Sequence, residues 1–290
     1  MKRALLIMLA LLVSLTAVAG CAGGGQGGGQ GGGGGGQEEE NTLRVGMECA
    51  YAPYNWTQST DANGAVQIQN SQDFAFGYDV MMAKLLADRI GYKLEIHKMD
   101  WDSLPAAVQS GTIDCAIAGQ SITDERKLTI DFTEPYYYAS IVCLVDGGST
   151  FASAEGISGL AGASCTSQLN TVWYDACLPQ ISGANILPAM DSAPAMLVSL
   201  TSGMCDLVVT DMPTAMAAVS VYPQLKLLDF TGKSDNFAVS EQEINIGISV
   251  MKGNADLLGK LNGALADLTV ADFERMMDEA IRVQPLSLEE

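Results

Sequence analysis

A guanidinium and a helix start lie close together in one short stretch of the chain. An apolar run from Cys115 to Ala118 ends at Gly119, and Thr123 and Arg126 follow. The apolar run predicts a buried strand, and Thr123 with two acidic residues behind it predicts the start of a helix. Arg126 then lies in a first turn, where unpaired N–H groups and the helix dipole favour an anion. Its fork can bind a carboxylate or phosphate with two parallel hydrogen bonds. Alternatively, Arg126 pairs with one of the two acidic residues before it on a solvated helix end.

The same kind of unit occurs twice in the chain. Residues 105–114 and 196–206 each predict a helix closed by Ser-Gly and an Asp, and a buried strand follows each. The second strand, 207–210, ends at Asp211. Two similar α/β lobes follow from this repeat, and ligands of open α/β sheets bind at the carboxyl ends of the strands. Arg126 and Asp211 then face one cleft, and a free α-amino acid is the simplest ligand with matching charges.

Several segments, taken in order from about Leu43 to Glu290, resemble the solute-binding proteins of polar amino acid ABC importers. The resemblance rests on residues 114–126 and on 45–54, 77–80, Trp101-Asp102 and 130–137. It implies an α/β, two-lobed type II periplasmic-binding-protein-like fold with two hinge crossings. It also implies a binder of free amino acids that delivers its ligand to the permease and ATPase subunits of an ABC importer.

The resemblance implies a role for each residue around the ligand's charged groups. Asp211, the Gly119 carbonyl and the Ser121 hydroxyl would hold the ammonium. Arg126 and the N–H groups near Ser121 and Thr171 would hold the carboxylate. Asp211 could instead, or in addition, cap the helix that follows it.

Three residues would contact the ligand's side chain according to the same resemblance: Glu48, Tyr51 and Trp101. A carboxylate about 4 Å from a ligand charge contributes on the order of 4 kcal/mol at an effective dielectric of about 20. Glu48 therefore favours arginine, lysine or ornithine over acidic amino acids. Alternatively, it hydrogen-bonds a neutral amide, as in a glutamine binder. Trp101 could stack on the ligand or simply pack.

One position departs from the family pattern. Members of the family commonly have Gly-Thr where Asn170-Thr171 stands. Asn tolerates the left-handed backbone better than most residues, so the turn can form. The departure weakens the assignment of Thr171.

The first 41 residues predict export and a lipid anchor. Lys2-Arg3, a short apolar run and a small-residue end predict a signal peptide over 1–20. Residues 18–21 resemble a lipobox, which implies that Cys21 carries a lipid such as palmitate. The Gly-rich segment 21–41 cannot build a core and predicts a flexible tether. We expect the chain on the outer face of the cell membrane of a single-membrane bacterium.

The remaining chain is expected to divide into two lobes. Lobe 1 would comprise 42–140 and 243–290, and lobe 2 would comprise 141–242. Residues 136–138 predict the first hinge crossing, and a strand over 244–250 would return the chain to lobe 1. Within lobe 2, a strand over 160–166 and a helix from Val172 are predicted.

Composition excludes several other functions. With 34 acidic and 15 basic residues, the net charge of −19 argues against binding to nucleic acid and against electrostatic attachment to anionic lipid. The single histidine, His97, excludes a clustered histidine metal site, and no nucleophile–base pair is evident. No catalytic residue, metal or cofactor is therefore expected, and we expect a monomer. Apart from Cys21, six cysteines could form disulfides or lie buried as free thiols: Cys49, Cys115, Cys143, Cys165, Cys177 and Cys205.

Two other functions remain open at this stage. One is a sensor that signals through a membrane partner. The other is a periplasmic-type dehydratase acting on ring acids, which would need a placed acid or base beyond the groups that bind ammonium and carboxylate.

Overall fold

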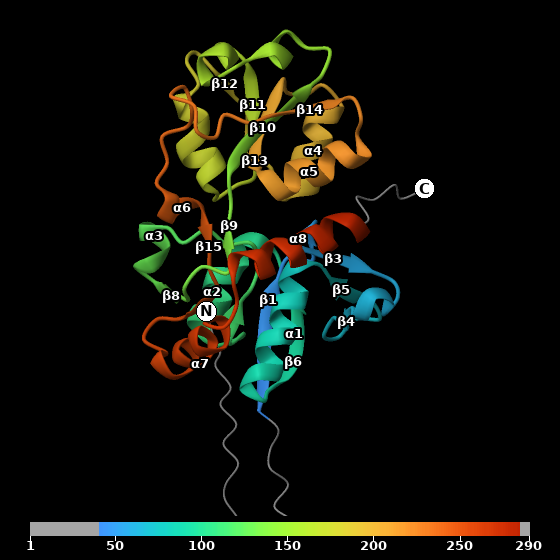
Figure 1. Cartoon of the computed structure of the whole chain (residues 1–290), viewed down its shortest axis with the longest axis vertical. Coiled ribbons are helices and arrows are strands. Elements are labelled where there is room, and N and C mark those ends of the chain that lie inside the picture. The colour runs from blue at the N-terminus through green and yellow to red at the C-terminus, as the bar shows by residue number, and fades with distance from the viewer. Residues whose placement is uncertain (1–40, 285–290) are drawn as a thin grey trace, which may run out of the picture. The chain divides into compact units, whose positions relative to one another are not determined.

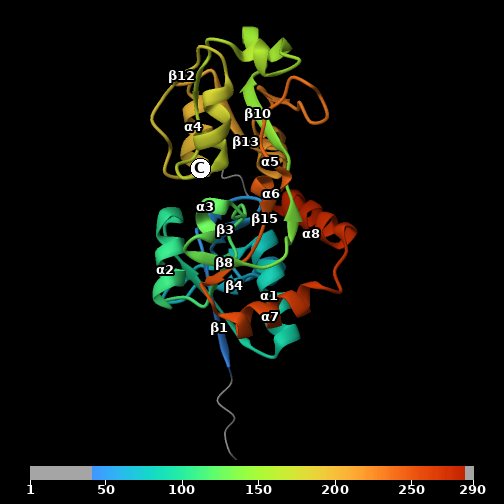
Figure 2. The same cartoon turned by 90° about the vertical axis from the view of Figure 1, so that its left-hand side faces the viewer.

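Two five-stranded sheets organise residues 41–284, the part of the chain that the computed structural model describes. The predicted signal peptide, Cys21 and nearly all of the predicted tether lie outside these residues. Figures 1 and 2 show the elements of the two sheets gathered at opposite ends of the views, with α1 and α7 at one end and α4 and α5 at the other.

The first sheet mixes parallel and antiparallel strands. Its order is β6 (Lys93–Lys98), β1 (Thr42–Met47), β7 (Cys115–Ala116), β16 (Ser249–Met251), β8 (Ile130–Phe132). β1 is parallel to both β6 and β7. β16, from near the end of the chain, lies antiparallel between β7 and β8. The helices of this lobe are α1 (Tyr78–Ile90), α2 (Leu104–Ser110), α3 (Asp124–Lys127), α7 (Ala255–Leu265) and α8 (Val270–Val283).

The sequence of helix α1 accounts for its buried face and for its end. Met82 and Leu86 recur on one face and are fully buried. Gly91 ends the helix in the left-handed conformation, with φ of 71°, which glycine adopts without a Cβ clash. The helix start, Gly77, approaches the chain so closely that a Cβ there would lie 2.3 Å from the Tyr54 carbonyl oxygen.

The second sheet is buried on both faces. Its order is β12 (Asn185–Ile186), β11 (Ser164–Thr166), β13 (Leu207–Asp211), β10 (Ile141–Asp146), β14 (Leu225–Leu228). Five of the six residues of β10 are buried. Val142, Leu144 and Val208 pack with residues of α4 (Ala193–Thr201) and α5 (Met212–Val221). Cys143 and Val209 face the opposite way, into the larger core.

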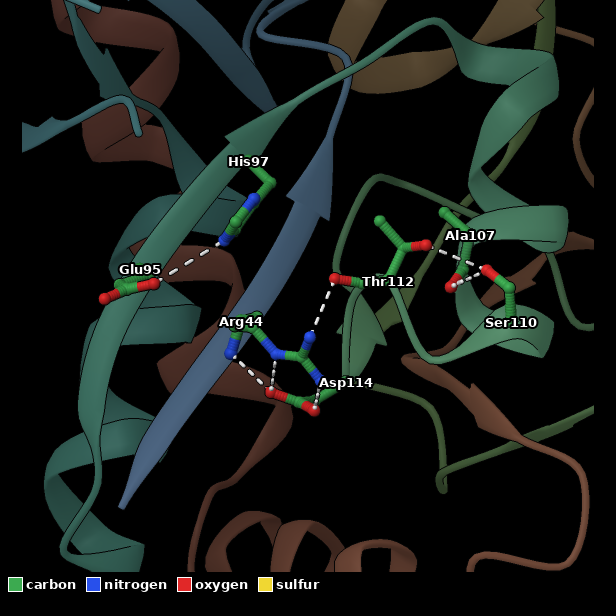
Figure 3. A network of polar contacts seen from close by, with 7 residues as sticks. All are labelled: Arg44, Glu95, His97, Ala107, Ser110, Thr112 and Asp114. Carbon is green, nitrogen blue, oxygen red and sulfur yellow. Dashed lines mark hydrogen bonds and ion pairs between the residues drawn. The ribbon is translucent and has the colours of Figure 1, made fainter. Parts of the chain in front are cut away.

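The repeated Ser-Gly…Asp unit makes the same contacts in both sheets. Asp114 accepts the backbone N–H of Arg44 at 2.8 Å and donates its own N–H to the Arg44 carbonyl at 2.9 Å. Figure 3 shows the Asp114 carboxylate also facing the Arg44 guanidinium, 2.5 Å away. Asp206 makes the same two backbone contacts with Ser164, each at 2.8 Å. The repeat therefore ties each helix turn to the neighbouring strand.

A short antiparallel pair connects the parts of the chain that carry the two sheets. β9 (Tyr137–Tyr138) pairs with β15 (Asn245–Ile246), and Figure 1 shows this pair between the two groups of elements. These are the places where the hinge crossings are predicted. The predicted single strand over 244–250 is wrong, because α6 (Glu241–Ile244), β15 and β16 divide it. Gly247 separates β15 from β16, and a Cβ there would lie 2.7 Å from Ile122 Cδ1. The lobe boundaries themselves remain our prediction.

Other predicted elements are shorter than expected. The strand predicted over 160–166 covers only β11, because residues 157–160 form a 3₁₀ turn. The helix predicted from Val172 is a π-helical turn, Trp173–Cys177, followed by a 3₁₀ turn. Residues 50–76 form a separate small sheet in the order β2 (Ala50–Tyr51), β3 (Asn55–Gln58), β5 (Phe74–Phe76), β4 (Val66–Gln67).

The six cysteines within residues 41–284 are buried free thiols, one of the two states left open by the sequence. His97 lies on β6 with its Nε2 3.7 Å from the Glu95 carboxylate (Figure 3). None of the helices that the structure describes has the length and apolar character needed to span a bilayer.

Candidate ligand-binding site

Arg126 lies in the first turn of α3, as predicted. The Thr123 hydroxyl caps this helix by accepting the Arg126 backbone N–H at 3.2 Å. One end of the guanidinium donates to the Ser121 carbonyl at 2.7 Å, and the other donates to the Asn170 carbonyl at 2.8 Å. Burial lowers the pKa of Arg126 to about 10, so the group stays protonated at neutral pH. No carboxylate of the described residues forms an ion pair with it, so neither acidic neighbour on α3 neutralises the charge.

Asp211 ends β13 and begins α5. Its Oδ1 accepts the Thr214 N–H at 2.8 Å, so the carboxylate does cap the helix. Its Oδ2 accepts the Tyr51 hydroxyl, which comes from the other half of the molecule. Asp211 is 1% exposed, and burial raises its pKa, which the hydrogen bonds from Tyr51 and Thr214 oppose. Each oxygen of Asp211 therefore already accepts one hydrogen bond, and a ligand ammonium would have to use the lone pairs that remain.

The loop between β7 and α3 carries two of the predicted site residues, Gly119 and Ser121. Gly119 has φ of 61°, and a Cβ there would lie 2.6 Å from Tyr51 Cε1. Only glycine therefore allows the loop to approach the Tyr51 ring this closely. Its N–H donates to the Tyr136 hydroxyl at 3.1 Å, which leaves its carbonyl as the free acceptor. Ser121 follows and forms an isolated bridge with Ile246 at the crossing.

Glu48 and Gln168 meet across the two halves of the site. Gln168 Nε2 donates to Glu48 Oε2 at 3.3 Å, and both residues are buried. Burial raises the pKa of Glu48 to about 7, while the Gln168 hydrogen bond and nearby Lys98 oppose the shift. Gln168 lies two residues before Asn170-Thr171, and nothing in the sequence pattern assigned it a role.

Trp101 and Thr171 form the side of the site near Arg126. The Trp101 indole N–H donates to the Leu169 carbonyl at 3.1 Å, and its ring centroid lies 5.4 Å from Arg126 Cζ. The Trp101 ring is therefore buried and lies against the Arg126 guanidinium, while its N–H makes a contact with the other lobe. The Thr171 hydroxyl donates to the Gln168 carbonyl at 2.7 Å. Asn170 has φ of 54°, the left-handed backbone that lets Asn replace Gly in this turn.

Two adjoining cavities collect most of the predicted site residues. A small cavity is lined by Tyr51, Trp101, Gly119, Ser121, Arg126, Gln168, Thr171 and Trp173. A second small cavity has Asp211 in its lining and shares Ser121 and Trp173 with the first. Glu48 lines neither cavity and reaches the first through Gln168. The structure thus brings seven of the eight predicted residues to one pair of cavities, and Glu48 lies behind them.

Sequence reasoning missed Trp173 and Gln168. Trp173 lies between the two cavities, and its ring centroid is 6.2 Å from that of Tyr51. The signal in the sequence was its position two residues after Thr171, near the start of the helix predicted from Val172.

Comparison with known proteins identifies the family. The family model for bacterial extracellular solute-binding proteins, family 3, matches residues 43–278. The chain belongs to this family. A curated relative, the L-cystine-binding protein TcyJ of Escherichia coli (strain K12), is 29% identical over 233 residues, which cover 80% of this chain and 79% of the relative.

Solved structures of similar proteins agree with the family 3 fold. An amino acid ABC transporter substrate-binding protein from Streptococcus pneumoniae, bound to L-arginine, aligns with a TM-score of 0.70 at 25% identity, over 84% of this chain and 95% of that one. An ancestral arginine-binding protein, solved with arginine and with glutamine, aligns with a TM-score of 0.65 at 30% identity, over 83% of this chain. In the arginine-bound structure, 98% of that protein is covered. The predicted type II periplasmic-binding-protein fold is confirmed.

Proposed function

We propose that this family 3 protein binds a free L-amino acid outside the cell and delivers it to the permease and ATPase subunits of an ABC importer. The observation that carries the proposal is the placement of Arg126 and Asp211 at two adjoining cavities with shared walls. One group is a cation without an ion pair among the described residues, and the other is a buried carboxylate. An α-amino acid supplies the complementary charges at the spacing of one carbon atom.

Each end of the ligand has a defined set of partners. The Arg126 guanidinium, which also donates to the Ser121 carbonyl, would bind the ligand's carboxylate together with the backbone near Thr171. The Gly119 carbonyl, the Ser121 hydroxyl and Asp211 would bind the ammonium. Because these partners come from both lobes, a ligand that touches all of them favours the closed arrangement. The importer would then recognise the closed form.

The nature of the ligand's side chain depends on the Glu48–Gln168 pair. As a carboxylate, Glu48 favours a cationic side chain, in agreement with the arginine bound by the structural relatives described above. The pair also offers one amide and one carboxyl group, which suits a neutral polar side chain such as that of glutamine. We propose a cationic ligand, with a neutral polar amino acid as the second candidate.

A thermal shift panel tests the proposed function directly. The melting temperature of the purified protein is measured against each standard amino acid, ornithine, citrulline and cystine. A ligand at about 100 times its dissociation constant adds roughly 2.7 kcal/mol of stability. A rise with arginine, lysine or ornithine supports the cationic assignment, and a rise only with glutamine or another neutral amino acid replaces it. No rise with any amino acid contradicts the proposed function.

Catalysis is the rival function with one structural observation in its favour. Glu48 is a buried carboxyl group with a pKa of about 7, a property that general acids and bases share. We propose that Glu48 acts on the ligand's side chain through Gln168 instead, because it hydrogen-bonds Gln168 and lines neither cavity, whereas a general acid or base must reach the reacting atoms. Turnover of a prephenate-like ring acid, abolished by Glu48→Gln, would overturn this assignment.

The membrane attachment is a separate proposal based on sequence. We propose that Cys21 is acylated after removal of residues 1–20 and that the Gly-rich segment holds a monomeric binding domain near the membrane surface. Cells fed a clickable palmitate analogue should label the wild-type protein and not Cys21→Ala. Equal labelling of both would exclude acylation at this residue.

A further inference from the structure

Asp79 is a fully buried carboxylate outside the candidate site. It lies in the first turn of α1 and has no exposed surface. Among the residues that the structure describes, no cation forms an ion pair with it. Its oxygens instead accept hydrogen bonds from the Tyr136 hydroxyl at 2.6 Å and from Asn55 Nδ2 at 2.7 Å. Burying a carboxylate without an ion pair is unfavourable unless hydrogen bonds compensate, so we asked what the two hydrogen-bonded branches from Asp79 position.

The first branch from Asp79 leads to the loop at the ligand cavity. The Tyr136 hydroxyl accepts the Gly119 N–H at 3.1 Å and donates its proton to Asp79. A carboxylate at this place fixes the direction of the chain, because an ionised Asp79 can only accept. The Gly119 N–H therefore points away from the cavity. The Gly119 carbonyl, on the other side of its residue, is the acceptor assigned to the ligand's ammonium.

The second branch leads to the loop that carries Glu48 and Tyr51. Asn55 is fully buried and accepts the Cys49 N–H at 2.7 Å through its Oδ1. Cys49 has φ of 53°, a backbone conformation that is uncommon outside glycine and that requires support. The Asn55 side chain supplies this support, and Asp79 orients the Asn55 amide.

We propose that Asp79 is a positioning residue that fixes two binding segments, 48–51 and 119–121, relative to each other at the candidate site. The proposal rests on the proposed function and concerns how the same site is preorganised. The loops meet where the Tyr51 ring packs against Gly119, a contact too close for any Cβ. A small displacement of either loop therefore changes both the Tyr51–Asp211 contact and the direction of the Gly119 carbonyl.

Conservative variants separate positioning from general stability. Tyr136→Phe removes the link between Asp79 and Gly119. Asp79→Asn replaces one of the two acceptor oxygens by an NH₂ donor, so at most one of the two branches keeps its acceptor. Tyr78→Phe is the matched control, because Tyr78 is equally buried and its hydroxyl donates to the Tyr136 backbone carbonyl, not to Asp79 or Gly119. Affinity for the best amino acid of the thermal shift panel is measured by calorimetry, and the Gly119 amide resonance is followed by NMR with ¹⁵N-labelled protein.

We expect Tyr136→Phe and Asp79→Asn to weaken binding by about 10- to 100-fold, the usual effect of losing a supporting hydrogen bond behind a site. Both should shift the Gly119 amide resonance. Tyr78→Phe should lower the melting temperature and leave affinity within about twofold, because it keeps the ring and leaves both hydrogen bonds of the Tyr136 hydroxyl in place. Loss of stability in all three variants, with unchanged affinity and an unmoved Gly119 resonance, would overturn the proposal.

Two further outcomes have distinct meanings. If wild type binds no amino acid, the proposed function fails, and the Gly119 resonance still reports whether Asp79 holds the loop. If Asp79→Asn does not fold, Tyr136→Phe and hydrogen exchange in the wild type decide. Rapid exchange of the wild-type Gly119 amide would contradict the proposed anchoring, because a fixed hydrogen bond to Tyr136 slows exchange.

Discussion

At the scale of single residues, the proposed function depends most directly on Arg126. Arg126→Ala should weaken amino acid binding by about 2–5 kcal/mol, since it leaves the ligand carboxylate buried without its charged partner. Arg126→Lys should recover only part of this loss, because an ammonium cannot form two parallel hydrogen bonds. Calorimetric titration of each variant gives the affinity.

The neighbouring cation on α3 provides a matched control for this experiment. Lys127 pairs with Asp124 at 3.2 Å and does not line either cavity of the candidate site. Lys127→Ala should bind as tightly as wild type. Equal affinity of Arg126→Ala and Lys127→Ala, both folded, would show that the carboxylate is bound elsewhere.

Glu48 should make binding of a cationic amino acid dependent on pH. The neutral carboxyl group predominates below its pKa of about 7. A cationic side chain favours the carboxylate, so affinity should rise as pH increases from about 6 to 8, with proton release on binding near neutrality. Titration in buffers of different ionisation enthalpy measures the released proton. Glu48→Gln should remove the dependence, and an unchanged pH profile in this variant would contradict it.

The same carboxyl group affects stability with a defined sign. Its pKa is raised on folding, so the folded protein binds the proton more tightly than the unfolded chain does. Its contribution to stability is therefore complete below about pH 4.5 and is lost as pH rises towards 7. In the absence of ligand, Glu48→Gln should retain stability across this interval better than wild type, as measured by thermal melting.

At the scale of elements, the capping of α8 can be tested independently of the site. The Thr269 side chain accepts the Asp272 N–H, and the Asp272 carboxylate accepts the Thr269 N–H at 3.0 Å. Thr269→Ala should lower the free energy of unfolding by about 1 kcal/mol, with no effect on ligand affinity. Thr269→Ser keeps the hydroxyl and serves as the control, so a similar loss in Thr269→Ser would point to packing rather than capping.

Elements with strong local signals were predictable from the sequence. The Thr123 cap and Gly91 at the end of α1 each determine backbone hydrogen bonds within a few residues. The Ser-Gly…Asp repeat recurs with the same contacts, although its Asp binds a strand 70 or 42 residues earlier. The break in 244–250 was not predictable in the same way. Gly247 marks a close approach to Ile122, a residue more than a hundred positions earlier, and alternating apolar residues carry no trace of such a contact.

The site residues also divide into those that the sequence could predict and those that it could not. Asp211 follows one predicted strand directly, and Arg126 follows another by one short loop, so topology brings both to one cleft. Gln168 enters the site through a turn whose course depends on the left-handed Asn170 and on Arg126 from the opposite lobe. Asp79 has only the appearance of an acidic residue in the first turn of a helix, a common surface arrangement, although it is fully buried.

At the scale of the whole molecule, a few polar contacts connect the two halves around the site. The Trp101–Leu169 hydrogen bond is the one that can be removed with the least change, because Trp101 also packs through its ring. Replacement with Phe keeps an aromatic ring and removes the N–H. We expect Trp101→Phe to increase the radius of gyration of the ligand-free protein in small-angle X-ray scattering. Saturating ligand should restore the wild-type value, and identical curves for both proteins without ligand would show that this contact does not favour closure.

The place of β16 in the first sheet has a consequence for how the protein is made. β16 separates β7 from β8, so β8 has no partner in that sheet until the ribosome has synthesised residues 249–251. All five strands of the second sheet lie between residues 141 and 228 and are complete earlier. We therefore expect the middle of the polypeptide to acquire its structure before its beginning does. An exported chain would leave the translocation channel with a folded centre, preceded by four strands of the first sheet and followed by the single strand that completes it.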